Sequence, residues 1–487
     1  MHGPDMLPWK SIIRVNKKES RAVYLQVADA IIDELMAGRI SKAYKMPGTR
    51  ILAEELKLNR KTVSLAYDEL LAQGWLEVIP SKGTYIKNSL PIQKHQSLPQ
   101  NPSYQPGRFV ESLSNLSFVA NQDFTCPINT IDDGTPDYRM APIDILLKTA
   151  RSISRGNIGR SVLLNASSYG NITLRKTLVT YLSSTRALNG SEENILVTRG
   201  SQMAIYLLFN VLLKKGDNVI VGELNYKNAD QIIQHLGANL IKIPLDNTGL
   251  NIQEIEKACL ENKIRAVYIS PHHHYPTTVT MPTENRIKLL ELSSQYNFAI
   301  VEDDYDYDYH YTGTPILPLS SLDRSGNVIY IGSFSKILVP SVRMGYVFAH
   351  PKVIHEIAKL RRMIDKQGDP ITERALAELI KENEIQRCLK KAVVAYKNRR
   401  DIFCSRLQSE LANEIDFNIP DGGMAIWATF NNDIIVKELV KKAKQNNLFL
   451  NIDPERTPHS CRLGFASMNE EEMDWNLNAL LKTVKEY

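Results

Sequence analysis

The sequence lacks the long apolar run that a membrane-spanning helix requires, which is roughly 20 residues. Its longest candidate, residues 204–213, is about half that length and contains Asn210. The opening residues, MHGPDMLPWK, also lack the apolar stretch of a secretory signal peptide. We therefore expect no membrane segment and a location in the cytoplasm.

Cysteine is scarce and scattered along the chain. The five residues are Cys126, Cys259, Cys388, Cys404 and Cys461, and no two of them form a Cys-x-x-Cys pair. This spacing excludes a disulfide framework of the kind that holds small secreted domains together. The cysteines are therefore predicted to be reduced thiols that mostly fill the core.

A strong net charge is absent as well, because the whole chain carries only +5. Residues 10–88 hold 14 Lys and Arg against 9 Asp and Glu, so this segment accounts for the entire excess. A basic front end on a neutral body suggests that the front end meets a polyanion such as nucleic acid. Ordinary surface variation is the alternative explanation for an excess of this size.

The chain has 487 residues, which predicts two or three folding units. Residues 10–88 show helical periodicity, residues 89–125 have the Pro-, Ser-, Gln- and Asn-rich composition of a linker, and residues 126–487 alternate apolar runs with amphipathic stretches. The apolar runs cover residues 194–198, 218–222, 239–243, 266–270, 298–303, 327–333 and 345–349. This alternation predicts an α/β domain with a mostly parallel sheet, followed over about 351–487 by a smaller, helix-rich C-terminal part.

Within the front end, the periodicity predicts three helices, over 24–38, 50–56 and 60–73. Thr49 and Asn59 are the expected N-caps of the second and third helices. Two short helices joined by a tight turn are typical of a helix-turn-helix, whose second helix reads DNA. The alternating stretch that follows, WLEVIPSKGTYI, turns at Lys-Gly and predicts a β-hairpin wing. A small helical interaction domain remains the alternative.

The segment MPGTRILAEELKLNRKTVSLAYDELLAQGWLEVIPSKGTYI, residues 46–86, resembles the winged helix-turn-helix domain of the GntR family. Order, spacing and wing agree along the whole segment. The resemblance implies binding to a double-stranded DNA operator, in a protein that associates with the nucleoid when it is bound. The contacts that it implies come from Arg50, Arg60, Lys61, Thr62, Ser64, Lys82 and Gly83. Ser64 and Lys82 also fit an ordinary exposed surface.

Residues that suit pyridoxal 5′-phosphate (PLP) follow three of the predicted strands. PLP needs a lysine for a Schiff base, a carboxylate for its pyridine nitrogen, a hydroxyl for its ring oxygen and an anion-binding cluster for its phosphate. Lys336 ends the segment GSFSK after one strand, and Arg343 follows seven residues later. EDDY, residues 302–305, ends a second strand, and TRGSQ, residues 198–202, ends a third just before a helix. Strand ends are where ligands bind in such sheets.

Together with the front end, these segments resemble MocR-type regulators, in which a GntR-type domain is fused to a class I/II aminotransferase-like domain. The matching segments include TRGSQMA, IVEDDYDYDYHY, YIGSFSKILVPSVRMGY and CRLGFAS. The resemblance covers nearly the whole chain. It implies a PLP-dependent transferase-like fold, PLP as cofactor and a homodimer formed through the PLP domain.

The resemblance also implies a role for each site residue. Lys336 is the Schiff-base lysine, Asp303 the partner of the pyridine nitrogen and Tyr305 the donor to the ring oxygen, while Tyr226 stacks on the ring. Arg462 holds the carboxylate of an effector. Residues at the phosphate are Gly200, Ser201, Gln202, Ser333, Ser335 and Arg343, with Tyr169 reaching the phosphate of the partner subunit.

The sequence departs from the family's pattern at several of these places. Tyr275 stands where metabolic aminotransferases have an asparagine that touches the ring oxygen, and we place it in the effector region. Lys227 and Asn228 stand where a GABA-sensing relative has a second arginine. The tract His272–His274 is a candidate for metal binding. Adjacent side chains of a strand point to opposite faces, however, so we expect no metal site.

Three functions are compatible with these residues. The first is a transcription regulator that senses PLP, or an amino acid or other amine that forms an aldimine in its aminotransferase-like domain. The second is an active aminotransferase that carries a DNA-binding domain. The third is a DNA-binding scaffold with a vestigial PLP site, which the presence of Lys336, Asp303 and Arg343 disfavours. The DNA reader favours the first, with slow or latent transamination at most.

Overall fold

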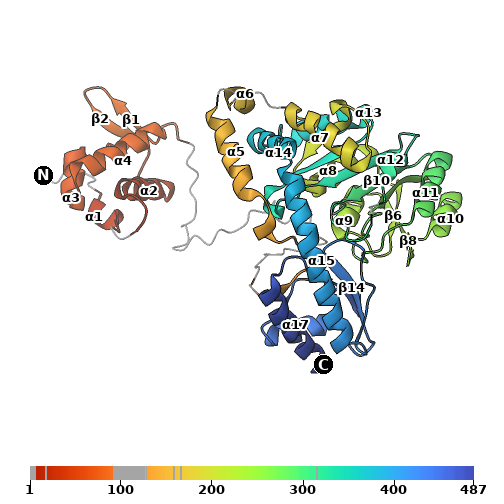
Figure 1. Ribbon diagram of the computed structural model, residues 1–487. Coiled ribbons are helices and arrows are strands. Elements are labelled where there is room, and N and C mark those ends of the chain that lie inside the picture. Colours follow the sequence, from red (N-terminus) through yellow and green to blue (C-terminus); the bar gives the residue numbers. More distant parts are fainter. Residues whose placement is uncertain are drawn as a thin grey trace. The chain divides into compact units, whose positions relative to one another are not determined.

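The computed structural model describes residues 7–16, 19–90, 127, 129–156, 159–164, 167–313 and 316–487. The chain divides into two compact units, Met1–Leu116 and Ser117–Tyr487 (Figure 1). Apart from residues 89 and 90, the predicted linker over 89–125 lies outside the described residues. Every helix among the described residues is too short or too polar to span a membrane.

The first unit is a small helical bundle with a β-hairpin. Its elements are α1 (Trp9–Ile12), α2 (Val23–Met36), α3 (Thr49–Leu56), α4 (Arg60–Ala72), β1 (Leu76–Ile79) and β2 (Gly83–Ile86). β1 and β2 pair antiparallel, with Ile79 opposite Gly83 at the tip. The inward faces of the helices and of the hairpin close one core, which includes Val27, Leu52 and Val63. This arrangement is the predicted winged helix-turn-helix.

The two predicted helix caps of this unit have different outcomes. The Asn59 side chain accepts a hydrogen bond from the Lys61 amide at 2.9 Å, so it caps α4 as predicted. The prediction for Thr49 is wrong, because Thr49 is already the first helical residue and the extended Gly48 is the N-cap. The Gly48 carbonyl accepts from the Leu52 amide at 3.0 Å, which starts the helix one residue earlier than expected.

The second unit is organised around a seven-stranded sheet with the strand order β4-β12-β11-β10-β9-β5-β6. The strands are β4 (Ile195–Thr198), β5 (Asn218–Gly222), β6 (Asn239–Ile243), β9 (Ile264–Ile269), β10 (Ala299–Asp304), β11 (Val328–Ser333) and β12 (Gly345–Phe348). β12 runs antiparallel to both of its neighbours, and the other pairs are parallel. Each of the seven predicted apolar runs overlaps one of these strands, so the mostly parallel sheet is confirmed.

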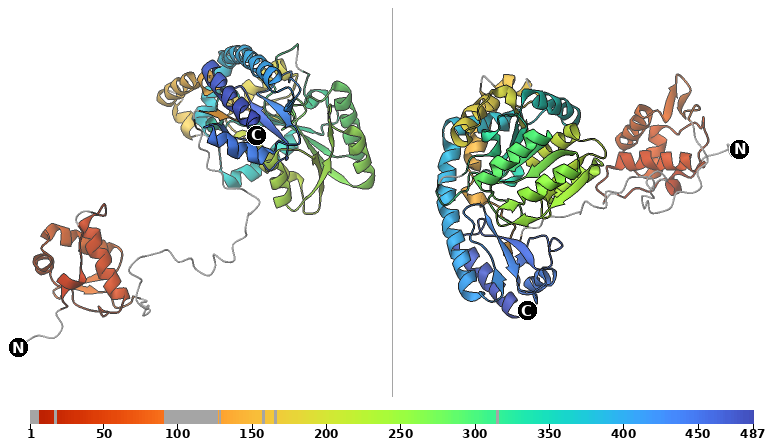
Figure 2. Two further views of the ribbon diagram at one scale, coloured as in Figure 1. Left: turned by 90° about the horizontal axis from the view of Figure 1, so that it is seen from below. Right: turned by 90° about the vertical axis from the view of Figure 1, so that its right-hand side faces the viewer.

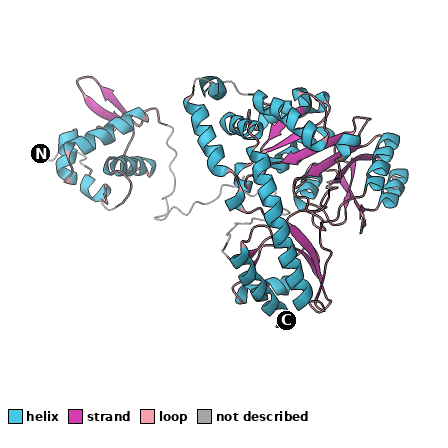
Figure 3. Ribbon diagram, in the orientation of Figure 1, coloured by secondary structure: helices cyan, strands magenta, loops and turns pink. Residues whose placement is uncertain are grey.

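Helices cover both faces of this sheet, as Figures 1 and 3 show. Val219 and Val221 of β5 join a core with α8 (Gly200–Leu212), whereas Ile220 between them joins a core with α10 (Ile252–Glu261). The remaining elements of this part are α5 (Ile143–Arg155), α6 (Gly159–Leu164), α7 (Ile172–Arg186), α9 (Lys227–His235), α11 (Thr283–Tyr296), α12 (Leu319–Leu322), α13 (Pro351–Ile364), α14 (Pro370–Lys381), β7 (Leu245–Asp246), β8 (Gly249–Leu250) and the 3-10 turns η2 (Tyr138–Met140), η3 (Glu192–Asn194) and η4 (Pro340–Val342). A strand buried on both faces explains why its sequence is continuously apolar.

The long helix α15 links the sheet to a smaller C-terminal part (Figures 1 and 2). The elements here are α15 (Glu384–Glu410), β13 (Ile415–Asp416), β14 (Ala425–Phe430), α16 (Val436–Gln445), β15 (Phe449–Leu450), β16 (Ser460–Gly464) and α17 (Glu470–Lys485). β13, β14 and β16 form an antiparallel sheet. Early in the second unit, β3 (Thr130–Ile131) pairs with β15, and the Gly464 amide donates to the Asp132 carbonyl at 2.6 Å. The loop after β3 therefore lies beside β16.

Candidate functional site

The predicted DNA contacts lie on the solvent side of the first unit. α4 buries Val63 and Leu70, while Arg60 and Lys61 at its N-terminus are exposed. The other predicted contacts are Arg50, Lys82 and Gly83, which are exposed, and Thr62 and Ser64, which are half-buried. Lys45, which was not predicted from the sequence, pairs with Tyr85 of β2 and so lies beside the wing. The N-terminus of α4 and the wing both present cations to solvent.

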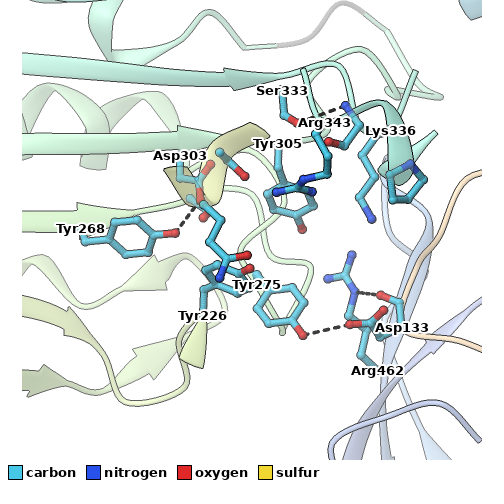
Figure 4. A pocket seen from close by; sticks show the side chains of 15 residues that line it. Asp133, Tyr226, Tyr268, Tyr275, Asp303, Tyr305, Ser333, Lys336, Arg343 and Arg462 are labelled. Carbon is cyan, nitrogen blue, oxygen red and sulfur yellow. Dashed lines mark hydrogen bonds between the residues drawn. The ribbon is translucent and has the colours of Figure 1, made fainter. Parts of the chain in front are cut away.

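A cavity of about 250 Å³ lies in the second unit, next to the carboxyl ends of β4, β9, β10 and β11 (Figure 4). It is lined by Asp133, Ser201, Gln202, Tyr226, Tyr268, Ser270, Tyr275, Asp303, Tyr305, Ser333, Ser335, Lys336, Pro340, Arg343 and Arg462. The strands end together because they are parallel, so residues far apart in the sequence meet here. Of the residues predicted for cofactor and effector, all but Gly200 and Tyr169 line this cavity.

Asp303 sits at the end of β10 and is buried. The Tyr268 hydroxyl donates to its Oδ2 at 2.5 Å, and burial raises the pKa of Asp303 to about 7. Within the described residues, its other oxygen, Oδ1, is buried and has no hydrogen-bond partner. An unpartnered buried acceptor is costly. A cationic N–H, such as that of a protonated pyridine, would both satisfy Oδ1 and favour the ionised carboxylate.

Lys336 follows β11 and extends into the cavity from the side opposite Asp303 (Figure 4). Its Nζ donates to the Gly134 carbonyl at 2.5 Å. Burial lowers the pKa of Lys336 below its usual value, and the neighbouring Asp133 carboxylate opposes that shift. A lysine with a lowered pKa holds more of its amine in the unprotonated form, which is the form that attacks a carbonyl carbon.

Groups suited to an anion gather at the first turn of α8. Ser201 and Gln202 belong to that turn, and Arg343 approaches it closely enough that a Cβ on Gly200 would lie 2.8 Å from the Arg343 Nη2. The Arg343 Nη2 also donates to the Arg199 carbonyl at 3.3 Å. A helix N-terminus with a guanidinium and hydroxyls beside it favours a phosphate. Gly200 thus acts by leaving room for Arg343 rather than by lining the cavity.

Tyr275 and Arg462 form the opposite wall with Asp133. The Arg462 Nε donates to the Asp133 carbonyl at 2.7 Å, and its Nη1 donates to the Pro276 carbonyl at 3.2 Å. The Tyr275 hydroxyl donates to the Asp133 Oδ2 at 3.0 Å, and the Arg462 guanidinium lies 5.2 Å from the centre of the Tyr275 ring. A buried guanidinium here offers a fixed cation to an anionic group of a ligand.

Two predicted residues have other partners in this structure. The Tyr169 hydroxyl lies 2.7 Å from the His355 Nδ1, away from the cavity, so a role at a cofactor requires the cavity of a second subunit. The Tyr305 ring lines the cavity, but its hydroxyl donates to the His273 carbonyl at 2.7 Å. Donation from Tyr305 to a ring oxygen would therefore require the hydroxyl to turn.

The histidine tract is a loop, not a strand, because β9 ends at Ile269. The three imidazoles nevertheless diverge: His272 lies 3.2 Å from Asp304, His273 2.8 Å from Asp306 and His274 2.9 Å from the Thr277 hydroxyl. Burial lowers the pKa of His274 to about 3, which keeps it neutral. Within the described residues, no group of three or more potential ligands is placed to hold a metal.

Five residues of the site were not predicted from the sequence. They are Asp133, Tyr268, Ser270 and Pro340, which line the cavity, and Gly134, whose carbonyl holds Lys336. Tyr268 and Ser270 could have been found, because they end a predicted strand next to the one that carries Asp303. Asp133 and Gly134 lie in a polar loop whose sequence carries no signal of what it contacts.

The raised pKa of Asp303 predicts a pH dependence of stability in the cofactor-free protein. The unfolded carboxyl titrates near 3.9, whereas the folded one titrates at about 7. The folded state therefore holds a proton that the unfolded state has lost, and its stabilising effect disappears as pH rises through about 7. We expect Asp303→Asn to exceed the wild type in free energy of unfolding by a margin that grows by at least about 1 kcal/mol between pH 5 and pH 8. Urea unfolding at both pH values measures it, and a constant margin would contradict it.

Each of the two units matches a known protein family. Residues 134–480 match the family Aminotransferase class I and II, and residues 23–86 match Bacterial regulatory proteins, gntR family. The probable rhizopine catabolism regulatory protein MocR of Rhizobium meliloti is 26% identical over 469 residues, which cover 94% of this chain and 93% of that protein. Aromatic-amino-acid aminotransferase 1 of Thermococcus litoralis is 28% identical over 375 residues, which cover 74% and 89%.

Solved aminotransferase structures resemble the second unit. The crystal structure of the kynurenine aminotransferase of Pyrococcus horikoshii superimposes with a TM-score of 0.71 at 26% identity, covering 78% of this chain and 98% of that one. This likeness confirms the predicted PLP-dependent transferase-like fold. The chain therefore belongs to the class I and II aminotransferase family, in the MocR-type arrangement, in which a GntR-family helix-turn-helix domain precedes the aminotransferase-like domain.

Proposed function

We propose that this protein is a transcription regulator whose DNA affinity responds to PLP, and to an amino acid, in the cavity of its second unit. The observation that carries the proposal is Asp303 Oδ1, which faces Lys336 across the cavity and has no hydrogen-bond partner among the described residues, in a chain that also holds a helix-turn-helix. Such a regulator would act in the cytoplasm, bound to its operator. Titrating apo protein with PLP while measuring operator affinity tests the proposal, and an unchanged affinity with PLP and with amino acids would contradict it.

The residues present fit PLP at its pyridine nitrogen, its aldehyde carbon and its phosphate, whereas donation to its ring oxygen requires the Tyr305 hydroxyl to turn from the His273 carbonyl. Asp303 would hold the pyridine nitrogen, Lys336 would bond to the aldehyde carbon, and the first turn of α8 with Arg343 would hold the phosphate. Tyr226 would cover the ring, because it lines the same cavity and its hydroxyl is fixed by Asn228 at 3.0 Å. When bound, PLP supplies an electrophilic carbon that amines can attack and a ring that accepts electrons.

An amino acid is the effector class that suits the remaining wall. Its carboxylate would lie on Arg462, and its amino group would compete with the Lys336 amine for the cofactor. A ligand shifts a conformational equilibrium only if it binds the two states differently. Releasing Lys336 and engaging Arg462 at once would supply that difference, because Arg462 lies on β16 of the C-terminal part whereas Lys336 follows β11 of the large sheet.

An active aminotransferase is the second candidate, and the completeness of the cavity favours it. The groups suited to the pyridine nitrogen, the aldehyde carbon and the phosphate all line it. Rapid exchange of amino groups between an amino acid and a 2-oxo acid, with no change in operator affinity, would establish this function instead. We favour the regulator because a metabolic enzyme has no use for the exposed cations of α4 and the wing.

For DNA, we expect Arg60→Ala to weaken specific binding by about 1–3 kcal/mol if Arg60 reads a base edge. Lys82→Ala should instead weaken all sequences alike and reduce the salt slope by about one, because a wing lysine contacts phosphate. Sites selected from random DNA and titrated at several salt concentrations measure both effects. Arg39→Ala, an exposed arginine paired with Glu34 at the end of α2, is the control. Equal competition by scrambled DNA would contradict specific reading.

For assembly, we expect a homodimer at micromolar concentration, because Tyr169 faces away from the cavity of its own chain. Tyr169→Phe should leave the dimer intact and weaken PLP retention, by about tenfold if one phosphate contact of about 1.4 kcal/mol is lost. Analytical ultracentrifugation and equilibrium dialysis measure the two quantities. A monomer, or unchanged retention in the variant, would rule out a shared site.

A further inference from the structure

Five charged side chains line the cavity: Asp133, Asp303, Lys336, Arg343 and Arg462. The proposed function assigns Asp303, Lys336 and Arg343 to the cofactor. One carboxylate and one guanidinium then remain for a second ligand, on the wall that Tyr275 completes. The wall that would meet the effector therefore carries one negative and one positive side chain. Its charge is not that of Arg462 alone.

Asp133 is held so that its carboxylate stays at this wall. Its carbonyl accepts from the Arg462 Nε at 2.7 Å, and its Oδ2 accepts from the Tyr275 hydroxyl at 3.0 Å. Oδ1 accepts no hydrogen bond from any residue that the structure describes, and Asp133 lines the cavity. Figure 4 shows the Asp133 carboxylate between the Tyr275 hydroxyl and Arg462. Because its carbonyl and its Oδ2 are held by hydrogen bonds while Oδ1 is not, Asp133 presents a hydrogen-bond acceptor in a fixed orientation.

The neighbouring cations do not donate hydrogen bonds to the Asp133 carboxylate. Lys336 Nζ donates to the Gly134 carbonyl, not to Asp133. Arg456 lies 4.9 Å from the centre of the Tyr275 ring, but it is not among the residues that line the cavity, and its Nη1 donates to the Asn225 carbonyl at 2.8 Å. Lys336 and Arg462 interact with the charge of Asp133, but neither of these two cations donates a hydrogen bond to its Oδ1, which stays available to a ligand.

We infer that Asp133 selects the effector by charge, and that the effector is an α-amino acid whose side chain carries a cation. This inference rests on the proposed function. With the α-carboxylate on Arg462, a side-chain ammonium would meet Asp133 Oδ1 and form a charge-assisted hydrogen bond. An acidic side chain would meet a fixed carboxylate of the same sign in a partly buried site, where repulsion is strong. A neutral aliphatic side chain would gain no hydrogen bond from Asp133.

A purely structural role for Asp133 gives a different expectation. If Asp133 only positions Tyr275 and Arg462, removing its charge would weaken all amino acids alike. If it selects by charge, Asp133→Asn would weaken cationic amino acids and strengthen acidic ones. The asparagine is isosteric and keeps an oxygen for the Tyr275 hydroxyl, so the fold is preserved. A general loss of order would weaken the binding of both ligands, so it cannot weaken one and strengthen the other.

The experiment titrates PLP-loaded full-length protein with L-ornithine, L-norvaline and L-glutamate, following the cofactor absorbance. For the wild type we expect ornithine to bind most tightly and glutamate most weakly. In Asp133→Asn, ornithine should weaken about tenfold and glutamate should strengthen about tenfold, each equivalent to about 1.4 kcal/mol, with norvaline moving less than about threefold. Asp453→Asn is the matched control, because Asp453 pairs with Lys227 at 3.6 Å and with Arg456 at 3.9 Å, and none of these three residues lines the cavity.

The outcomes separate this inference from the proposed function. A uniform change for all three ligands, equal changes in the two variants, or no response to any of the three amino acids would overturn the role of Asp133. Operator affinity is measured on the same samples without amino acid, with and without PLP. A PLP-dependent operator affinity alongside any of those results would leave the regulator standing while the charge selection fails.

Discussion

Replacing Lys336 with alanine is expected to abolish covalent attachment of PLP completely. Among the described residues that line the cavity, Lys336 carries the only amine, so no other side chain there can bond to the aldehyde carbon. The absorbance of the lysine-linked cofactor should disappear. Some PLP should still bind through Asp303 and the phosphate cradle, but it should be lost on prolonged dialysis. Absorbance spectra before and after dialysis, together with mass spectrometry after borohydride reduction, measure both effects.

The control for this variant is Lys227→Ala. Lys227 begins α9 next to Tyr226, is half-exposed and pairs with Asp453, so it tests for a general effect of removing a lysine near the site. Its spectrum should match that of the wild type. A reduced adduct that persists in Lys336→Ala would show that a different lysine carries the cofactor. Operator affinity of Lys336→Ala, with and without added PLP, then shows whether the covalent link itself is part of the switch.

The large sheet could be predicted from the sequence because its strands are buried on both faces. A continuous apolar run such as residues 327–333 has few alternatives once Gly and polar residues bound it. The residues that end these runs, Asp303 and Ser333 among them, could be placed in one site because parallel strands end at the same edge. Order along the chain and the direction of the strands were enough to bring them together.

The wall that faces the effector could not be predicted in the same way. Asp133 comes from a loop after the two-residue strand β3, which pairs with β15 from the far end of the chain. Nothing in a short polar loop indicates such a distant partner. Tyr305 shows a second limit: its position in the cavity followed from the strand, but the direction of its hydroxyl depends on the His273 carbonyl. Hydrogen-bond partners of this kind are decided by tertiary packing and not by local pattern.

The second large effect is expected at Arg462, whose guanidinium is buried at the wall opposite Asp303. Arg462→Lys keeps the positive charge but loses the planar fork that can donate two parallel hydrogen bonds to a carboxylate. A lysine ammonium also has fewer N–H donors than a guanidinium. Those donors would have to serve the Asp133 and Pro276 carbonyls as well, to which Arg462 donates at 2.7 and 3.2 Å. We therefore expect amino acids to bind at least about tenfold more weakly, equivalent to about 1.4 kcal/mol, and Arg462→Ala to bind them about a hundredfold more weakly.

The decisive comparison for Arg462 uses two ligands of matched size, an amino acid and the corresponding amine without a carboxylate. If the guanidinium holds the carboxylate, both variants lose affinity for the amino acid, whereas affinity for the amine, which cannot use Arg462, stays nearly constant. PLP affinity should also stay within about threefold, since Arg462 contacts neither Asp303 nor the α8 turn among the hydrogen bonds of the described residues. Equal losses for the amine and the amino acid would mean that Arg462 only supports the wall formed by Tyr275 and the loop after β3. Thermal unfolding of each variant tests this supporting role. If Arg462 only supports the wall, the melting temperature falls in step with the affinity.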